Sequence, residues 1–154
     1  MSPLELIKSF LGIKRFAFIG VSRNPKDFSV MLLSDLEKRG FDVARVNPLA
    51  TELYGKPCFR SITEITPPVS TALVMLPKTA IRQVLDECKK TGIRLVWLYG
   101  VTGPREFDKD VLSYAAQLGL DVIPGYCPYM FLKDAMFFHR AHGFVARMIG
   151  MYPR

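Results

Sequence analysis

Residues 16–25 read FAFIGVSRNP and combine an apolar run, a glycine and a short polar loop. The apolar run ends at Gly20, and a helical pattern of apolar residues begins near Ser29. A strand, a tight glycine turn and a helix in this order form a βα unit that suits phosphate binding, because the turn exposes backbone N–H groups and the helix N-terminus favours an anion. A single glycine is not the GxGxxG pattern, so the interpretation depends on the rest of the chain.

The same alternation of apolar runs and helical stripes continues along the chain. Apolar runs predict strands at residues 16–19, 41–46, 71–76, 94–99 and 120–123. Helical spacing predicts helices at residues 29–39, 81–91 and 111–118, each followed by a glycine that can end it. Residues 54–57, YGKP, are predicted to lie in a loop, and residues 61–65 in a weak helical turn. This order predicts an α/β fold with a doubly wound parallel sheet of about five strands.

Two further helices are predicted at the ends. Residues 2–5, SPLE, form a capping box with proline at the first helical position, and Gly12 can end that helix. The tail, residues 131–154, carries a wide apolar stripe that includes Phe137, Phe144 and Met148. Two interpretations of the tail stay open: a last helix that covers the sheet, or a surface for self-association into a homodimer. We expect a single domain over residues 1–154 with its core at 14–130.

Composition restricts the class of protein. The chain has 154 residues, of which 49% are hydrophobic, and a net charge of +7 that suits a polyanionic partner. No stretch has the length and apolarity of a membrane span, and the start lacks the features of a signal peptide. Cys58, Cys88 and Cys127 form no CxxC pair, which predicts a reducing, cytoplasmic location.

In an open parallel sheet, ligands bind beyond the carboxyl ends of the strands. The residues predicted there are basic or amide-rich, with almost no carboxylate, and Arg45 and Lys56 add charges that could face phosphates. A dinucleotide site normally has an acidic residue at the end of its second strand, where this chain has Asn47. The rim therefore argues against NAD, and less strongly against NADP.

Six short motifs in a fixed order resemble one known family. They are IGVSRNP at 19–25, VNP at 46–48, YGKP at 54–57, LP at 76–77, WLYGV at 97–101 and YCP at 126–128. Together they resemble the stand-alone CoA-binding domain proteins, whose fold is similar to the N-terminal domain of the succinyl-CoA synthetase alpha subunit.

The resemblance implies a Rossmann-like domain that binds coenzyme A or an acyl-CoA. It implies roles for residues at the strand ends: Gly20, Val21, Ser22, Arg23, Asn24 and Pro25 around the diphosphate; Val46, Asn47 and Pro48 beside the adenosine; Leu76, Pro77 and Lys78 along the nucleotide and upper pantetheine; Tyr99, Gly100 and Val101 along the pantetheine. The synthetase pattern has a basic residue where this chain has Leu49, so Arg45 or Lys56 is expected to replace that contact to the 3′-phosphate. The phosphorylated-histidine domain of the synthetase is not expected here.

We expect binding of CoA without catalysis, and two alternatives stay open. One is a small NADP- or CoA-dependent enzyme that acts through Cys127 or a histidine. The other is an interaction module that uses the apolar tail. Cys127, His139 and His142 match no strong zinc template, so no metal is expected. Tyr126, Tyr129 and Phe131 are interleaved with few cations, so neither nucleic acid nor a membrane is an expected partner.

Overall fold

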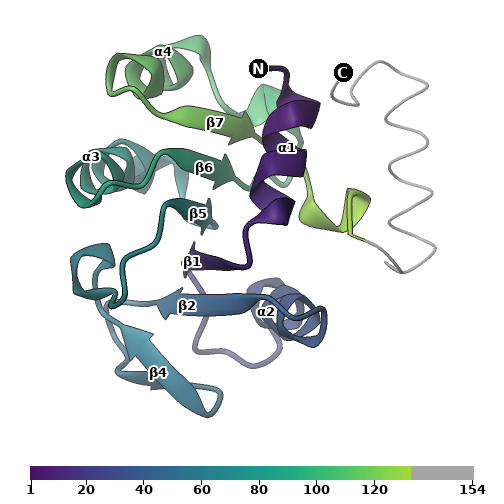
Figure 1. The fold of residues 1–154 in the computed structure, drawn as a ribbon, viewed down its shortest axis with the longest axis vertical. Helices are drawn as coiled ribbons and strands as arrows, with labels where there is room; N and C mark the ends of the chain where they lie inside the picture. Colours follow the sequence, from purple (N-terminus) through teal and green to yellow (C-terminus); the bar gives the residue numbers. More distant parts are fainter. Residues whose placement is uncertain (133–154) are drawn as a thin grey trace.

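The computed structural model describes residues 1–132, so the predicted C-terminal helix lies outside the described residues. Its centre is a seven-stranded sheet in the order β3-β4-β2-β1-β5-β6-β7 (Figure 1). Among the strands of residues 1–132, only the β3–β4 pair is antiparallel. The strands are β1 (Arg15–Ile19), β2 (Asp42–Val46), β3 (Glu52–Leu53), β4 (Lys56–Phe59), β5 (Thr71–Val74), β6 (Leu95–Leu98) and β7 (Asp121–Pro124).

The strand order is that of a nucleotide-binding fold. If the parallel strands are counted along the chain, their order across the sheet is 3-2-1-4-5-6, with the reversal between β1 and β5. The predicted class, a doubly wound Rossmann-like sheet, is confirmed, but the expected number of about five strands was too low. The missed strands, β3 and β4, form a hairpin at the edge; Tyr54 and Gly55 form its turn, so the prediction of a loop at residues 54–57 was wrong only for Lys56 and Pro57. Both strands are short, and β4 contains Pro57, which has no backbone N–H to donate to a neighbouring strand.

The helices cover both faces of the sheet (Figure 1). They are α1 (Pro3–Gly12), α2 (Phe28–Lys38), α3 (Ile81–Thr91) and α4 (Lys109–Gln117), with 3₁₀ turns η1 (Ile62–Glu64), η2 (Lys78–Ala80), η3 (Pro104–Glu106) and η4 (Pro128–Met130). The predicted capping box is confirmed, since Ser2 and Glu5 each bond the other's backbone N–H. Within residues 1–132, no helix has the length and apolarity needed to cross a membrane.

Successive residues of the buried strands point to opposite faces of the sheet and pack into two separate hydrophobic cores. Phe16 and Phe18 of β1 pack with α1, α2 and the fully buried Trp97 of β6. Ala17 and Ile19 pack on the opposite face with α3 and α4. Both faces of β1 are therefore covered, which explains why its sequence is a continuous apolar run rather than an alternation.

Gly20 marks the point where the chain leaves β1, next to the end of β5. Its φ of +101° lies in the region that favours glycine, and a Cβ there would lie 2.1 Å from the carbonyl oxygen of Met75. The glycine is therefore required by the neighbouring strand itself, in addition to any ligand that approaches the turn.

We expect Gly20→Ala to lower the free energy of unfolding by about 2 kcal/mol or more, because the methyl group meets backbone that cannot move independently. Gly12→Ala is the matched control, since a Cβ at Gly12 meets nothing within 4 Å. Chemical denaturation of both variants measures the difference. Equal stability of the two variants would contradict the close approach of β1 and β5.

Candidate functional site: a pocket beyond β1, β2 and β5

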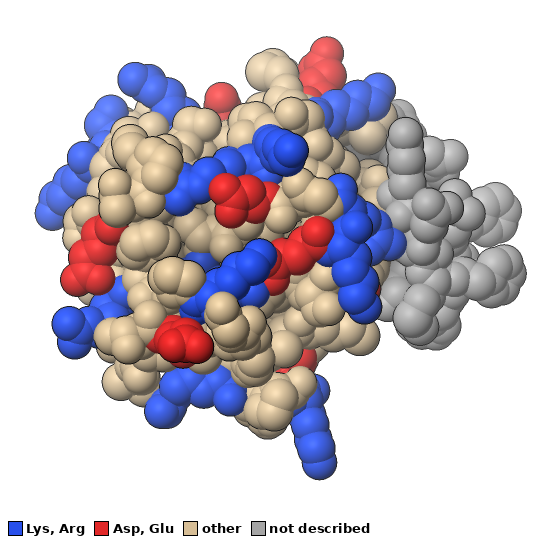
Figure 2. All heavy atoms as spheres, turned by 60° about the horizontal axis from the view of Figure 1, so that its bottom comes forward, with Lys and Arg blue, Asp and Glu red and all other residues tan. Residues whose placement is uncertain are grey.

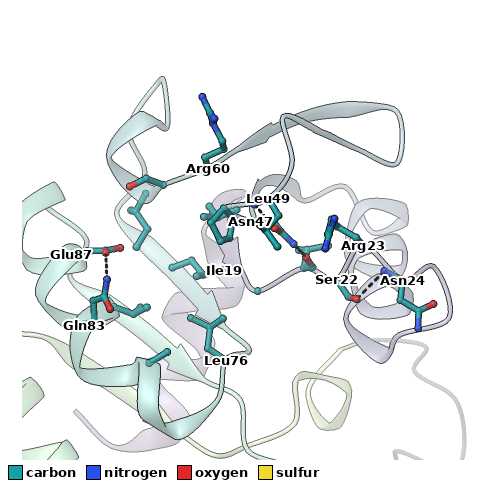
Figure 3. A pocket seen from close by; sticks show the side chains of 18 residues that line it. Ile19, Ser22, Arg23, Asn24, Asn47, Leu49, Arg60, Leu76, Gln83 and Glu87 are labelled. Atoms are coloured by element: carbon teal, nitrogen blue, oxygen red, sulfur yellow. Dashed lines mark hydrogen bonds between the residues drawn. The ribbon is translucent and has the colours of Figure 1, made fainter.

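A pocket of about 740 Å³ lies beyond the carboxyl ends of β1 and β2 and against α3 (Figure 3). We call this cavity the rim pocket. It adjoins the strand-order reversal between β1 and β5, where open α/β sheets bind ligands. Its volume is within the range of about 300–1,000 Å³ that is typical of small-molecule sites.

Nine of the residues predicted from sequence line the rim pocket, and nine other lining residues were missed. The predicted ones are Gly20, Val21, Ser22, Arg23, Asn24, Val46, Asn47, Pro48 and Leu76. Those not singled out as site residues are Ile19, Leu49, Arg60, Ser61, Ile62, Ala80, Gln83, Val84 and Glu87. Apart from Ile19 and Leu49, which adjoin predicted residues, the missed residues come from η2, α3 and the segment after β4, and only the folded topology brings them to the strand ends.

The loop between β1 and α2, residues 20–27, is ordered by its own polar side chains. The Ser22 amide donates to Ser29 Oγ at 3.0 Å, and the Asn24 amide donates to Ser22 Oγ at 3.0 Å. The Lys26 amide donates to Asn24 Oδ1 at 3.1 Å. Within residues 1–132, the amides of Val21 and Arg23 donate no such bond.

These two amides are the donors of the loop that have no acceptor within residues 1–132. Both residues line the rim pocket, and Val21 is fully buried. A buried backbone N–H without an acceptor is rare in a folded protein, because its desolvation is not compensated. Phosphate oxygens at this end of the pocket would supply the missing acceptors, and the exposed Arg23 adds a positive charge.

The N-terminus of α2 already carries an anion from the chain itself. Asp27 is the N-cap residue, and its carboxylate accepts from the Ser29 amide at 2.9 Å and from Ser29 Oγ at 2.7 Å. The helix end is therefore partly neutralised.

Asn47 lines the rim pocket, but both polar atoms of its side-chain amide form hydrogen bonds with backbone groups. Its Nδ2 donates to the Val21 carbonyl at 2.8 Å, and its Oδ1 accepts from the Leu49 amide at 2.9 Å. The residue thus connects the end of β2 to the loop after β1. It cannot accept two ribose hydroxyls as the acidic residue of a dinucleotide site does.

A carboxylate does line the rim pocket, although the sequence predicted almost none at the rim. Glu87 lies on α3, across the pocket from Ser22 and Arg23 (Figure 3). Its Oε1 accepts from Nε2 of Gln83 at 3.4 Å. Glu87 belongs to the middle of a helix rather than to a strand end, so the rule that ligands bind at strand ends does not point to it.

Arg45 and Lys56, which were expected to contact phosphate, line a different cavity. Both pair with the carboxylate of Glu37 on α2. They line a groove of about 560 Å³ beside α2, and neither lines the rim pocket. Strand alternation explains this placement, because Val46 faces the rim pocket and its neighbour Arg45 must face the other side of the sheet. Arg60, an exposed cation, lies at the rim pocket instead (Figure 3).

The remaining predicted residues lie near the rim but not in the pocket. Pro25 is in the β1–α2 loop, and Pro77 and Lys78 are exposed at η2. The Tyr99 ring stacks on Phe28 with centroids 5.4 Å apart. Gly100 is buried and Val101 is exposed, both directly after β6.

On one face of the molecule, charges of both signs are mixed rather than gathered in one patch (Figure 2). On the face shown in Figure 2, Lys and Arg side chains are interspersed with carboxylates. The local charge at the rim pocket therefore depends on its own residues, chiefly Arg23, Arg60 and Glu87.

Cys127 is a poor candidate for a nucleophile. Burial raises the pKa of its thiol, although the backbone amides of Tyr129 and Met130 act in the opposite direction. Burial also raises the pKa of the nearby Tyr99 hydroxyl to about 12. At neutral pH both groups keep their protons, so neither supplies the anion that nucleophilic catalysis requires.

Comparison with known proteins gives the family. The sequence profile of the CoA-binding domain family matches residues 14–133. The alpha subunit of an ADP-forming acetate–CoA ligase from Pyrococcus furiosus is 28% identical in an alignment of length 129 that covers 79% of this chain and 28% of that subunit. The chain therefore spans less than a third of this curated relative.

Solved structures agree with the fold. A conserved hypothetical protein from Pyrococcus furiosus has a TM-score of 0.67 at 26% identity, over 75% of this chain and 96% of that one. A dinucleotide-forming acetyl-coenzyme A synthetase from Candidatus Korarchaeum cryptofilum has a TM-score of 0.61 at 25% identity, over 71% of this chain and 25% of that one. The fold is a Rossmann-like α/β domain with a mostly parallel sheet. The chain belongs to the CoA-binding domain family.

The raised pKa of Cys127 predicts a specific pH dependence of alkylation. We expect iodoacetamide to modify Cys127 more slowly at pH 7.5 than it modifies free cysteine, and the rate at Cys127 to go on rising with pH beyond the usual thiol pKa of about 8.5. Peptide mapping by mass spectrometry distinguishes Cys127 from the buried Cys58 and Cys88. Fast, pH-independent modification of Cys127 below pH 7 would show an activated thiolate and favour an enzyme.

Proposed function

We propose that the chain binds coenzyme A or an acyl-CoA in the rim pocket and performs no chemistry on it. The observation that carries this proposal is the pair of amides at Val21 and Arg23, which have no acceptor within residues 1–132 and line a pocket of nucleotide size. Membership of the CoA-binding domain family points to the same ligand. The ligand's diphosphate accepts from these amides, in a loop that a glycine turn has shaped for it.

The lining of the pocket suggests how the nucleotide lies in it. The phosphates occupy the side of the β1–α2 loop, and the adenosine lies over the apolar surface of Ile62, Leu76 and Val84. Glu87, on the far side, accepts a hydrogen bond from an amino or hydroxyl group of the nucleoside. The pantetheine then crosses from the end of β5 to the end of β6, where Gly100 lies, because these two strands are neighbours.

The same residues favour CoA over NAD. The amide of Asn47 is occupied by the backbone, so the end of β2 offers no pair of acceptors for ribose hydroxyls. CoA has an additional 3′-phosphate on its ribose, and the cation available at the pocket is Arg60 in place of the expected Arg45 or Lys56.

The absence of chemistry is part of the proposal. Support comes from the protonated state of Cys127 and Tyr99, the two reactive side chains nearest the predicted pantetheine path. The relative named as a ligase subunit is much longer than this chain, which covers 28% of it. The proposal therefore does not carry the ligase activity over to this chain. A cytoplasmic location and a homodimer through residues 131–154 remain predictions.

Titration calorimetry with CoA, NAD and NADP tests the proposed function. We expect CoA to bind at least about tenfold more tightly than either dinucleotide, which corresponds to about 1.4 kcal/mol. Tighter binding of NAD than of CoA would overturn the assignment. Turnover of acetyl-CoA that disappears in Cys127→Ala would contradict binding without chemistry.

Two cations of the same loop provide a matched pair of variants. Arg23 lines the rim pocket, whereas Lys26, three residues further on, does not. We expect Arg23→Gln to weaken CoA binding about tenfold, through loss of a charge-assisted contact to phosphate. Lys26→Gln should change the affinity by no more than about twofold, as is usual for an exposed charge.

The dependence on salt provides the control for this pair. Raising the NaCl concentration should reduce the affinity of the unaltered protein more than that of Arg23→Gln, because salt screens the interaction that the variant lacks. Equal losses of affinity in the Arg23 and Lys26 variants would show that the phosphates lie elsewhere.

A further inference from the structure

The YGKP motif forms the turn of the β3–β4 hairpin, and the proposed binding of CoA gives it no role. Tyr54 and Gly55 are the two central residues of the turn, between the paired Leu53 and Lys56. The hydroxyl of Tyr54 donates to the carbonyl oxygen of Ser22 at 2.7 Å. A side chain from the edge of the sheet thus holds the β1–α2 loop at the centre of the sheet.

Tyrosine is an unusual choice for this turn. Tyr54 has a positive φ of 51°, and it is the one non-glycine residue with positive φ in the described part of the chain. Two-residue hairpin turns of this kind favour asparagine, aspartate or glycine at that position, because a bulky side chain is strained there. A residue that breaks the local rule is expected to have a compensating role. The hydroxyl bond to Ser22 provides one.

The planarity of the peptide bond connects this hydrogen bond to the rim pocket. In a trans peptide, the carbonyl of Ser22 and the N–H of Arg23 point in opposite directions. Tyr54 holds the carbonyl on the side of the α2 groove, which it lines together with Lys56. The Arg23 amide therefore points away from that groove, and Arg23 lines the rim pocket. This amide is one of the two without an acceptor among residues 1–132.

We infer that Tyr54 is a positioning residue for the ligand's phosphates. By fixing the Ser22 carbonyl, it holds the Arg23 amide in the direction in which a phosphate oxygen can accept from it before the ligand arrives. The β3–β4 hairpin is then part of the binding apparatus, although its residues do not contact the ligand. This inference rests on the proposed binding of a phosphate-bearing cofactor in the rim pocket.

Two substitutions separate positioning from a structural role. Tyr54→Phe keeps the ring and removes the hydroxyl, and should weaken CoA binding about three- to tenfold, as expected for one hydrogen bond. Tyr54→Asn places a favoured residue in the turn, so the midpoint of thermal unfolding should stay the same or rise while CoA binding weakens. A residue with a purely structural role would change affinity and stability in the same direction.

Amide hydrogen exchange of the ligand-free protein provides a readout that needs no ligand. We expect Tyr54→Phe to accelerate exchange at the amides of residues 21–23 and to leave the amides of α3 and α4 unchanged. Tyr114→Phe is the matched control, because its hydroxyl bonds Asp86 between α4 and α3, away from the loop. That control should leave both loop exchange and CoA affinity unchanged.

The outcomes distinguish this inference from the proposed function. If the unaltered chain binds CoA and Tyr54→Phe binds it equally well, the positioning role is overturned and the proposed function survives. If Tyr54→Phe weakens the binding of adenosine as much as that of CoA, the effect is not specific to phosphates and the inference is also overturned. If the unaltered chain does not bind CoA, both proposals fail.

Discussion

The contact between Gly20 and the carbonyl of Met75 determines how the rim of this domain is arranged. The chain can leave β1 this close to β5 only because Gly20 has no side chain and tolerates a φ of +101°. The loop that follows therefore begins where the strand order reverses. At this point the segments that leave β1 and β5 diverge from each other. A larger residue at this position would push the loop away from β5 and change the floor of the rim pocket.

The loop takes its shape from its own side chains and from three other segments. Ser29 Oγ on α2 accepts a hydrogen bond from the Ser22 amide. The side-chain amide of Asn47, at the end of β2, donates to the Val21 carbonyl, and the Tyr54 hydroxyl on the hairpin donates to the Ser22 carbonyl. The Val21 and Ser22 carbonyls are acceptors that a phosphate oxygen could not satisfy, so these two side chains supply the donors they need. The amides left over are those of Val21 and Arg23, two residues that line the rim pocket, and we propose that this division of partners makes the loop suitable for phosphate.

Much of the fold could be predicted because buried parallel strands give continuous apolar runs that helical stripes separate. The β3–β4 hairpin was missed because its strands are very short and contain Pro57. At the site, residues directly after β1 and β2 were found from the rule that ligands bind at strand ends. Glu87 could not be found that way, because it lies inside a helix. The position of Arg45 was predictable in principle, since it alternates with Val46 along β2.

A titration of the ¹⁵N-labelled protein with CoA, followed by amide chemical shifts, tests the central claim most directly. If the diphosphate binds where we place it, the largest shift changes will occur at the Val21 and Arg23 amides, with smaller ones at residues 46–49 and at Glu87. Changes confined to the α2 groove around Lys56, or to the loop after β6, would show that the rim pocket is not the binding site.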